Sequence, residues 1–162
     1  MKVISKTVIG AFAAMSLIAM SSVSAEACTV PSNLKKLRQG VVTQVNKKRA
    51  TQELRELQIR SKLNKAAQQH SCWIADHNAP QSHEGIDGTY VQDRVRKEGY
   101  IHTYVNENVG GGTLLKPREF VQAWWNSPVH KANILAKRSH HIGVGVAEAN
   151  GWRYWVMVTG NN

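Results

Sequence analysis

The sequence predicts an α+β fold in which one β-sheet is covered by helices on both sides. Two kinds of pattern support this class. Apolar residues recur at helical spacing in the first half of the chain, and a turn signal between alternating segments predicts a β-hairpin near the C-terminus. No repeat, low-complexity tract or long linker interrupts the 162 residues, so we expect one domain.

Two amphipathic helices are expected before residue 78. The first has apolar residues at helical spacing: Leu34, Leu37, Val41, Val42 and Val45. The polar segment 51–56 then breaks the pattern. The second helix carries one long stripe: Leu63, Ala66, Ala67, His70, Trp73, Ile74 and His77.

The middle of the chain alternates loops with short elements. They are expected in this order: a loop over 78–88, a helix over 90–98 opened by a capping box of Thr89 and Gln92, and an extended segment over 100–109 that ends at three glycines. Two more helices begin at prolines. Pro117 opens the first, with Phe120 and Trp124 on its buried face, and Pro128 opens the second, with Ser127 as its N-cap.

The C-terminal hairpin has two unlike faces. Asn150-Gly151 is a two-residue turn. Counting outward from it places large apolar residues on one face: Val146 opposite Trp155 and Val144 opposite Met157. The other face carries glycines: Gly145 opposite Val156 and Gly143 opposite Val158. Because glycine has no side chain, another backbone can approach this face closely, and a helix is the expected neighbour.

Residues 1–25 predict a signal peptide outside the fold. Lys2 and Lys6 precede an apolar stretch, Val8–Met20, that is too short to span a membrane. Small residues then suit cleavage after Ala25. The mature protein is therefore expected to be secreted or periplasmic, with no transmembrane segment.

The predicted cleavage leaves an N-terminal arm over 26–33 and a domain over 34–162. An uncleaved anchor is the alternative. Cys28 also raises the alternative of a lipoprotein that is lipidated at this cysteine, although Glu26 does not suit a lipidation signal.

Cys28 and Cys72 form an even pair, which in an exported protein suggests a disulfide. The bond would pin the arm to the second helix, on the side away from His70, and contribute roughly 3–4 kcal/mol to stability. Two independent thiols are the alternative. The two cysteines do not match the spacing of a zinc site.

The chain is strongly basic, with 21 Lys and Arg, 11 Asp and Glu and a net charge of +10. Such a surface favours anionic neighbours, which include lipid headgroups, anionic cell-envelope polymers and nucleic acid. A solvated basic surface without a partner explains the charge equally well, and no motif supports nucleic acid. We expect a monomer.

Three polar residues lie in distinctive frames: His83 in SHEG, Glu107 in NENV and His130 in WWNSPVHKANIL. Separations of 24 and 23 residues mean that only the tertiary fold can bring them together. Two imidazoles and a carboxylate in one pocket would make a metal site or an acid/base site. If the three residues do not meet, each has an ordinary explanation. His83 could be a surface residue, Glu107 an exposed strand residue and His130 a residue that caps its helix.

The remaining histidines and the tryptophans carry weaker signals. His70 and His77 lie on the apolar stripe and suit core histidines, whereas His102, His140 and His141 suit the surface or a strand edge, with His141 able to point toward a cleft. The tryptophans suit the core or a groove lining: Trp124, Trp125, Trp152 and Trp155. An aromatic groove for sugars or bases is the less favoured alternative. The sequence contains no HExxH helix, phosphate-binding loop or nucleophile elbow.

A series of motifs resembles the bacterial branch of the CAP superfamily, the SCP-like domain of cysteine-rich secretory, antigen 5 and pathogenesis-related proteins. In order, they are VNKKR, AAQQHS, SHEG, DRVRKEGY, NENV, AWWNSPVHKANIL, IGVGVA and YWVMVTG. The resemblance covers residues 34–160 and implies a three-layer α–β–α sandwich with a central cleft. It also implies cleft residues at His83, Glu107 and His130. A second glutamate of eukaryotic members is replaced here by Ser127, and the glycine of the GEN motif by Asn106.

The resemblance implies a divalent metal, zinc above all, held by His83 and His130. Our first hypothesis is a binding module at the cell envelope, whose cleft takes the metal and an extracellular ligand such as a lipid or an anionic polymer. The second is a metal-dependent hydrolase of cell-wall, peptide or nucleic-acid substrates, with Glu107 as general base and His83 and His130 at the catalytic site. The third is a structural network of hydrogen bonds. Shared fold does not choose among them.

Overall fold

The computed structural model describes residues 28–113 and 115–162 of the chain. The predicted signal peptide lies outside the described residues. The elements are α1 (Leu34–Ala50), β1 (Gln58–Ile59), α2 (Ser61–Asp76), a short 3-10 helix (Ile86–Gly88), α3 (Val91–Lys97), β2 (Tyr104–Thr113), α4 (Pro117–Asn126), α5 (Pro128–Ile134), β3 (His141–Ala149) and β4 (Trp152–Asn161).

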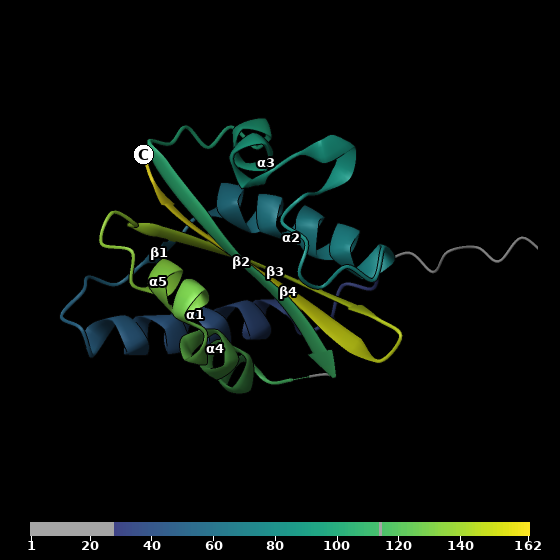
Figure 1. The fold of residues 1–162 in the computed structure, drawn as a ribbon, viewed down its shortest axis with the longest axis horizontal. Helices are drawn as coiled ribbons and strands as arrows, with labels where there is room; N and C mark the ends of the chain where they lie inside the picture. The colour runs from purple at the N-terminus through teal and green to yellow at the C-terminus, as the bar shows by residue number, and fades with distance from the viewer. Residues whose placement is uncertain (1–27, 114) are drawn as a thin grey trace, which may run out of the picture.

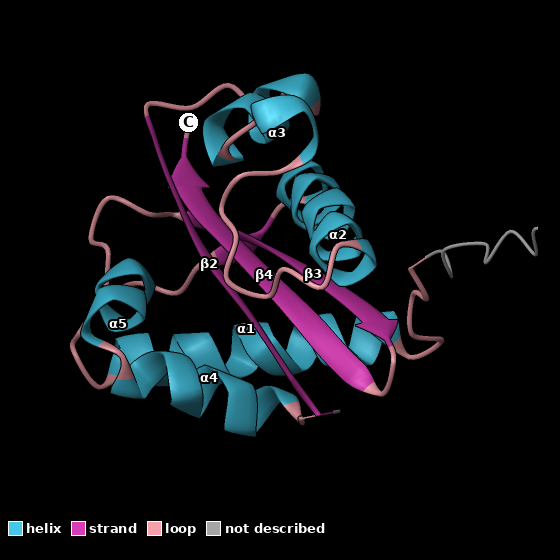
Figure 2. Cartoon of the chain, turned by 45° about the vertical axis from the view of Figure 1, so that its right-hand side comes forward, coloured by secondary structure: helices cyan, strands magenta, loops and turns pink. Residues whose placement is uncertain are grey.

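One four-stranded sheet separates two layers of helices (Figure 1). Its strand order is β1-β3-β4-β2, with β1 parallel to β3 and the other pairs antiparallel. Helices α1, α4 and α5 lie on one side of the sheet, and α2 and α3 on the other (Figure 2). Each side has its own buried apolar cluster. The predicted α–β–α sandwich is therefore confirmed.

The hairpin has the predicted register, with Val146 paired to Trp155 and Gly145 to Val156. Its bulky face packs against α1 and α4, where Trp155 is fully buried and stacks on Phe120, with ring centroids 5.3 Å apart. The alternating pattern of the hairpin thus assigns one face to each layer of helices.

The glycine face lies against α2, as predicted. A Cβ atom on Gly143 would overlap the backbone at Leu63 and Asn64, and one on Gly145 would overlap the backbone at Ala67. The polar side chains of α2 then bond to strand β3: Asn64 Oδ1 accepts the Val144 N–H at 2.8 Å. These contacts consequently fix the distance between α2 and the sheet.

The N-terminal arm is tied to the domain at two points. Cys28 and Cys72 form the predicted disulfide, with Cα atoms 5.1 Å apart. Thr29 pairs with Glu148 of β3 through two backbone hydrogen bonds of 3.1 and 2.8 Å. The sequence predicted the covalent tie and missed the strand-like one.

Two local predictions were wrong, and one short strand was missed. Strand β2 begins at Tyr104 and continues through the three glycines, because β4 is long enough to pair with all of them. The two-residue strand β1 was not expected. The capping contact of α3 lies one residue later than predicted: Asp93, rather than Gln92, accepts the backbone N–H of Tyr90 at 3.0 Å. Carboxylates accept this bond well because the helix N-terminus is positive.

In the part of the chain that the structure describes, no helix combines the length and apolar character needed to cross a membrane.

We predict that Gly145→Ala lowers the free energy of unfolding by about 3 kcal/mol, because the added methyl group meets the α2 backbone and no side-chain rotation can relieve the overlap. Gly112→Ala is the matched control, since its methyl group would lie 3.1 Å from the movable end of Leu115. Urea denaturation measures both. Equal losses for the two variants would contradict the close approach of α2.

Candidate functional site

A groove of about 640 Å³ crosses strand β2 and carries both predicted histidines. His83 reaches it from the loop after α2, and His130 reaches it from α5. Ser127, the residue at the position of the second glutamate, lies on the same wall as His130. The fold therefore brings together two imidazoles that are 47 residues apart in the sequence.

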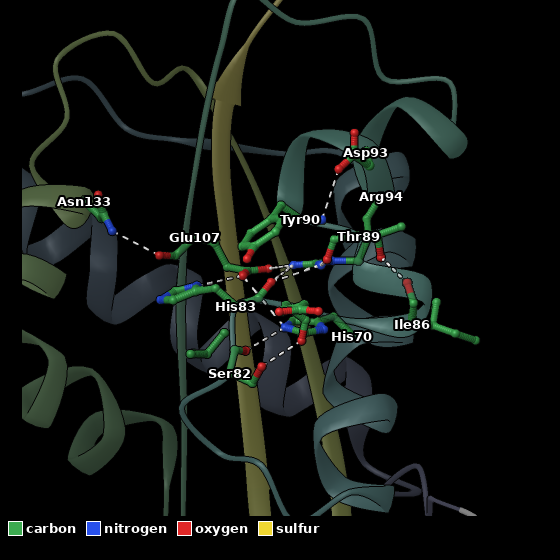
Figure 3. A network of polar contacts seen from close by, with 12 residues as sticks. His70, Ser82, His83, Ile86, Thr89, Tyr90, Asp93, Arg94, Glu107 and Asn133 are labelled. Carbon is green, nitrogen blue, oxygen red and sulfur yellow. Dashed lines mark hydrogen bonds and ion pairs between the residues drawn. The ribbon is translucent and has the colours of Figure 1, made fainter.

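Glu107 lies directly behind His83 and is almost fully buried (Figure 3). Its side chain is 2% exposed. One carboxylate oxygen, Oε1, accepts the His83 Nδ1–H at 2.9 Å, and the other, Oε2, accepts an Arg94 N–H at 2.8 Å. Both oxygens thus have strong donors, and the buried negative charge is paired.

The contact to Glu107 defines the tautomer of His83. A carboxylate only accepts hydrogen bonds, so Nδ1 of the imidazole carries a proton, and in the neutral ring the lone pair is on Nε2. The His83 side chain is 49% exposed and lines the groove. A free, oriented imidazole nitrogen in an open groove is what a metal ligand or a proton acceptor requires.

Arg94 of α3 is a site residue that sequence reasoning missed. Its guanidinium is 6% exposed, and besides Glu107 it binds the carbonyl oxygens of His83 at 3.2 Å and Thr89 at 2.6 Å. It therefore holds the His83 loop and the buried carboxylate at once. The available signal was indirect: a buried Glu107 needs a cation, but a chain with 21 basic residues does not indicate which.

His70 of α2 lies beneath this network and is buried, as expected of a core histidine. Its Nε2–H donates to the Ser82 carbonyl at 2.9 Å, and Nε2 lies 3.8 Å from the Glu107 carboxylate. Burial lowers the pKa of His70 below its usual value near 6.5, although the charge of Glu107 acts in the opposite direction. His70 is thus a neutral support for the loop that carries His83.

His130 is the third residue of α5, as predicted, and Ser127 holds the N-cap position without a side-chain capping bond. Burial lowers the pKa of His130, and the nearby His83 imidazole lowers it further. Both effects favour the neutral ring that binds metals.

Two asparagines fix α5 to strand β2. Asn108 donates to the His130 carbonyl at 3.0 Å, and Asn133 donates to the Glu107 carbonyl at 3.0 Å and to Asn108 Oδ1 at 2.8 Å. Sequence reasoning missed both residues, because an asparagine in a loop-like or helical segment gives no distinct pattern.

The donor set suits an open metal site with two protein ligands. Among the described residues, no group of three or more His, Cys, Asp or Glu side chains is placed to hold a metal ion. Glu107 is taken up by His83 and Arg94, and Ser127 offers a hydroxyl where a carboxylate would add charge. His83 and His130 are therefore the two imidazoles of the groove that could hold a divalent ion.

The expectation for His141 was wrong. It is 7% exposed, and its Nδ1 contacts the Tyr100 hydroxyl at 2.8 Å, so it lies in the core rather than at the surface or in the groove. Trp124 and Trp155 belong to the core, whereas Trp152 is 41% exposed and lines the groove.

Removing Arg94 should be far more damaging than removing its exposed neighbour. We predict that Arg94→Leu lowers the free energy of unfolding by about 3–5 kcal/mol, because it leaves the Glu107 charge buried and unpaired. Arg96→Leu, at a side chain that is 65% exposed, should change it by less than about 0.5 kcal/mol. Chemical denaturation of both variants checks the difference, and similar losses would show that Arg94 is dispensable to the network.

Stability should fall in mild acid. The folded pKa values of His70, His130 and His141 lie below the usual 6.5, so the unfolded chain binds more protons just below that pH. The free energy of unfolding should therefore be highest above pH ~6.5 and decrease as the pH falls through this window. His70→Gln should flatten the dependence, and His77→Gln, at an exposed position, should not. Denaturation measured across pH ~5–8 tests this, and equal slopes would contradict it.

Comparison with known proteins finds relatives at different levels of sequence identity. YkwD, an uncharacterized protein of Bacillus subtilis strain 168, is 33% identical to this chain over 121 residues. The alignment covers 75% of this chain and 46% of YkwD, so the chain spans about half the length of that relative.

Solved structures share the fold at low identity. An outer surface protein from Borrelia burgdorferi has a TM-score of 0.74 and 19% identity, covering 83% of this chain and 98% of that one. An extracellular protein of Bacillus anthracis that contains an SCP domain has a TM-score of 0.68 and 21% identity, covering 83% and 44%. NaASP2, solved with Zn²⁺, has a TM-score of 0.57 and 11% identity, covering 82% and 84%. At these identities the likeness concerns the fold.

The family assignment comes from the sequence itself. Residues 42–159, most of the chain, match the profile of the cysteine-rich secretory protein family, CAP. The α–β–α sandwich agrees with this match. The chain therefore belongs to the CAP family.

Proposed function

We propose that this protein is a secreted or periplasmic binding module whose groove takes up a divalent metal ion together with an extracellular ligand. Zinc is the metal that we favour. The observation that carries the proposal is the pair of imidazoles on one groove, with the His83 ring held by the buried Glu107 and Arg94 pair. His83 and His130 are the proposed metal ligands.

The arrangement behind His83 supports a metal rather than a loose surface histidine. Metal-binding histidines commonly donate their second ring N–H to a carboxylate, which fixes the tautomer and makes the free nitrogen more basic. Glu107 accepts this bond at 2.9 Å. The lowered pKa of His130 also keeps its ring neutral at physiological pH. Imidazole suits zinc, which NaASP2, a structure of the same fold, contains.

Two protein ligands leave several coordination positions to water or to a ligand in the groove. We therefore expect weaker metal binding than at a three-ligand site. When bound, the metal would supply a positive charge and a Lewis acid beside the groove. The protein's own contribution is to orient the two rings.

The hydrolase alternative receives less support. Glu107 was its proposed general base, but both carboxylate oxygens are occupied and the side chain is 2% exposed. A general base must lie within hydrogen-bond reach of the proton that it removes. Glu107 fits a positioning role better, and this favours a binding module over an enzyme.

The proposed location rests on three supports. The Cys28–Cys72 disulfide suits an oxidising compartment. Relatives of the same fold include an outer surface protein and an extracellular protein. The chain begins with a predicted signal peptide over residues 1–25. A net charge of +10 also suits anionic polymers or lipids of the cell envelope as neighbours.

We predict that the purified protein binds about one zinc ion and that His83→Ala or His130→Ala abolishes uptake. Glu107→Gln should weaken the affinity about 10–100-fold, because it loosens the orientation of His83. Calorimetric titration with zinc, supported by metal analysis of the natively purified protein, measures these effects.

His102→Ala is the control, since this ring lies outside the groove and contacts Tyr100, whose carbonyl oxygen is 3.3 Å from its Nδ1. Ser127→Glu should strengthen zinc binding by adding a carboxylate to the groove wall. Absence of zinc binding in the wild type, or uptake that survives both histidine substitutions, would remove the metal from this function. In that case a loss of stability alone would favour the structural network.

A further inference from the structure

We propose that the histidine groove continues into a second hollow that binds a sugar ring of a neutral oligosaccharide. This inference names the class of extracellular ligand and rests on the binding role proposed above. It is carried by an exposed indole, two amide side chains and a hollow without charge, at the end of the molecule where α2 ends and the hairpin turns (Figure 1).

The second hollow has a volume of about 400 Å³ and is lined by Asn78, Pro80, Asn150, Trp152 and Tyr154. Pro80 and Trp152 also line the groove of His83 and His130. The two spaces therefore share a wall, and a chain of linked rings could extend from one to the other.

Trp152 provides a flat apolar surface. Its side chain belongs to a residue that is 41% exposed. The indole edge packs close to the backbone of Gly111. A Cβ atom on Gly111 would lie 3.5 Å from the indole edge, 3.3 Å from Tyr154 and 2.9 Å from Pro80. The indole is thus held at its edge while part of its surface faces solvent.

The amides supply hydrogen bonds beside this surface. The Tyr154 hydroxyl donates to Asn78 Oδ1 at 2.9 Å, which fixes the Asn78 amide in one orientation. Within the described residues, neither the Asn78 NH₂ group nor the Asn150 side chain has a hydrogen-bond partner. These groups can donate to and accept from a ligand without breaking a bond in the protein.

The chemistry of the lining selects among ligand classes. None of the five lining residues is charged, in a chain with a net charge of +10, so neither a phosphate nor a carboxylate finds a counter-charge there. A hydrocarbon chain would cover the amides and leave them unpaired. A sugar ring suits both the indole and the amides of the hollow. Its C–H face packs on an indole, and its hydroxyl or acetamido groups bond to amides.

The test is a titration of the full chain with chitotetraose, a neutral chain of N-acetylglucosamine, followed by tryptophan fluorescence and calorimetry. Trp152→Ala should weaken binding about tenfold or more, since it removes the stacking surface. Asn78→Asp should weaken it roughly three- to tenfold, because the carboxylate still accepts the Tyr154 bond but has no N–H to donate.

Trp125→Ala is the matched control. That ring lies on α4 between Lys48 and Lys131, with their Nζ atoms 4.7 and 4.6 Å from its centroid, and is outside both hollows. Its loss should leave chitotetraose binding unchanged. Thermal melts of each variant separate loss of binding from loss of fold.

Zinc uptake separates this inference from the function on which it rests. Asn78→Asp, at a residue that lines only the second hollow, should keep zinc binding, and His83→Ala should lose zinc while it retains at least part of the sugar binding. No chitotetraose binding at millimolar concentration, or binding that Trp152→Ala leaves intact, would overturn the sugar subsite even if zinc binds. If the protein binds no zinc but binds chitotetraose in a way that depends on Trp152, only the proposed metal site would be overturned.

Discussion

The buried contact between Glu107 and Arg94 is the interaction on which the rest of the site depends. A carboxylate that is 2% exposed is stable there because a guanidinium satisfies one oxygen and the His83 imidazole the other. Arg94 brings α3 with it and also binds the His83 carbonyl. One charge pair therefore joins a helix, a loop and a strand, and the orientation of His83 in the groove follows from it.

The architecture could be predicted from local rules because each rule concerned neighbours in sequence. The Asn150-Gly151 turn set the register of the hairpin, and alternation then assigned its faces. The glycines at 143 and 145 predicted the close approach of a helix, which is α2. The extent of β2 could not be predicted, since its glycines become strand only through pairing with β4. The two-residue β1 depends entirely on β3 for the same reason.

The candidate site was predictable to the level of its histidines and its carboxylate. His83, Glu107 and His130 lie in short frames that also carry the family resemblance, so sequence alone could single them out. Arg94, Asn108 and Asn133 could not be found in this way, because their role is to complete contacts that exist only after folding. The same holds for His141, whose contact with the distant Tyr100 hydroxyl exists only after folding.

Adjacent residues of β2 hold the two sides of the groove. Glu107 faces the α2 and α3 layer and bonds His83, while Asn108 faces the opposite layer and bonds the backbone of His130. Side chains alternate strictly along a strand, so a slip of β2 by one residue against β4 would send both anchors to the wrong layers at once. The imidazole pair can therefore form only after the outermost strand has docked in its correct alignment. A ligand that binds both imidazoles would therefore stabilise only molecules in which this edge strand has its native register.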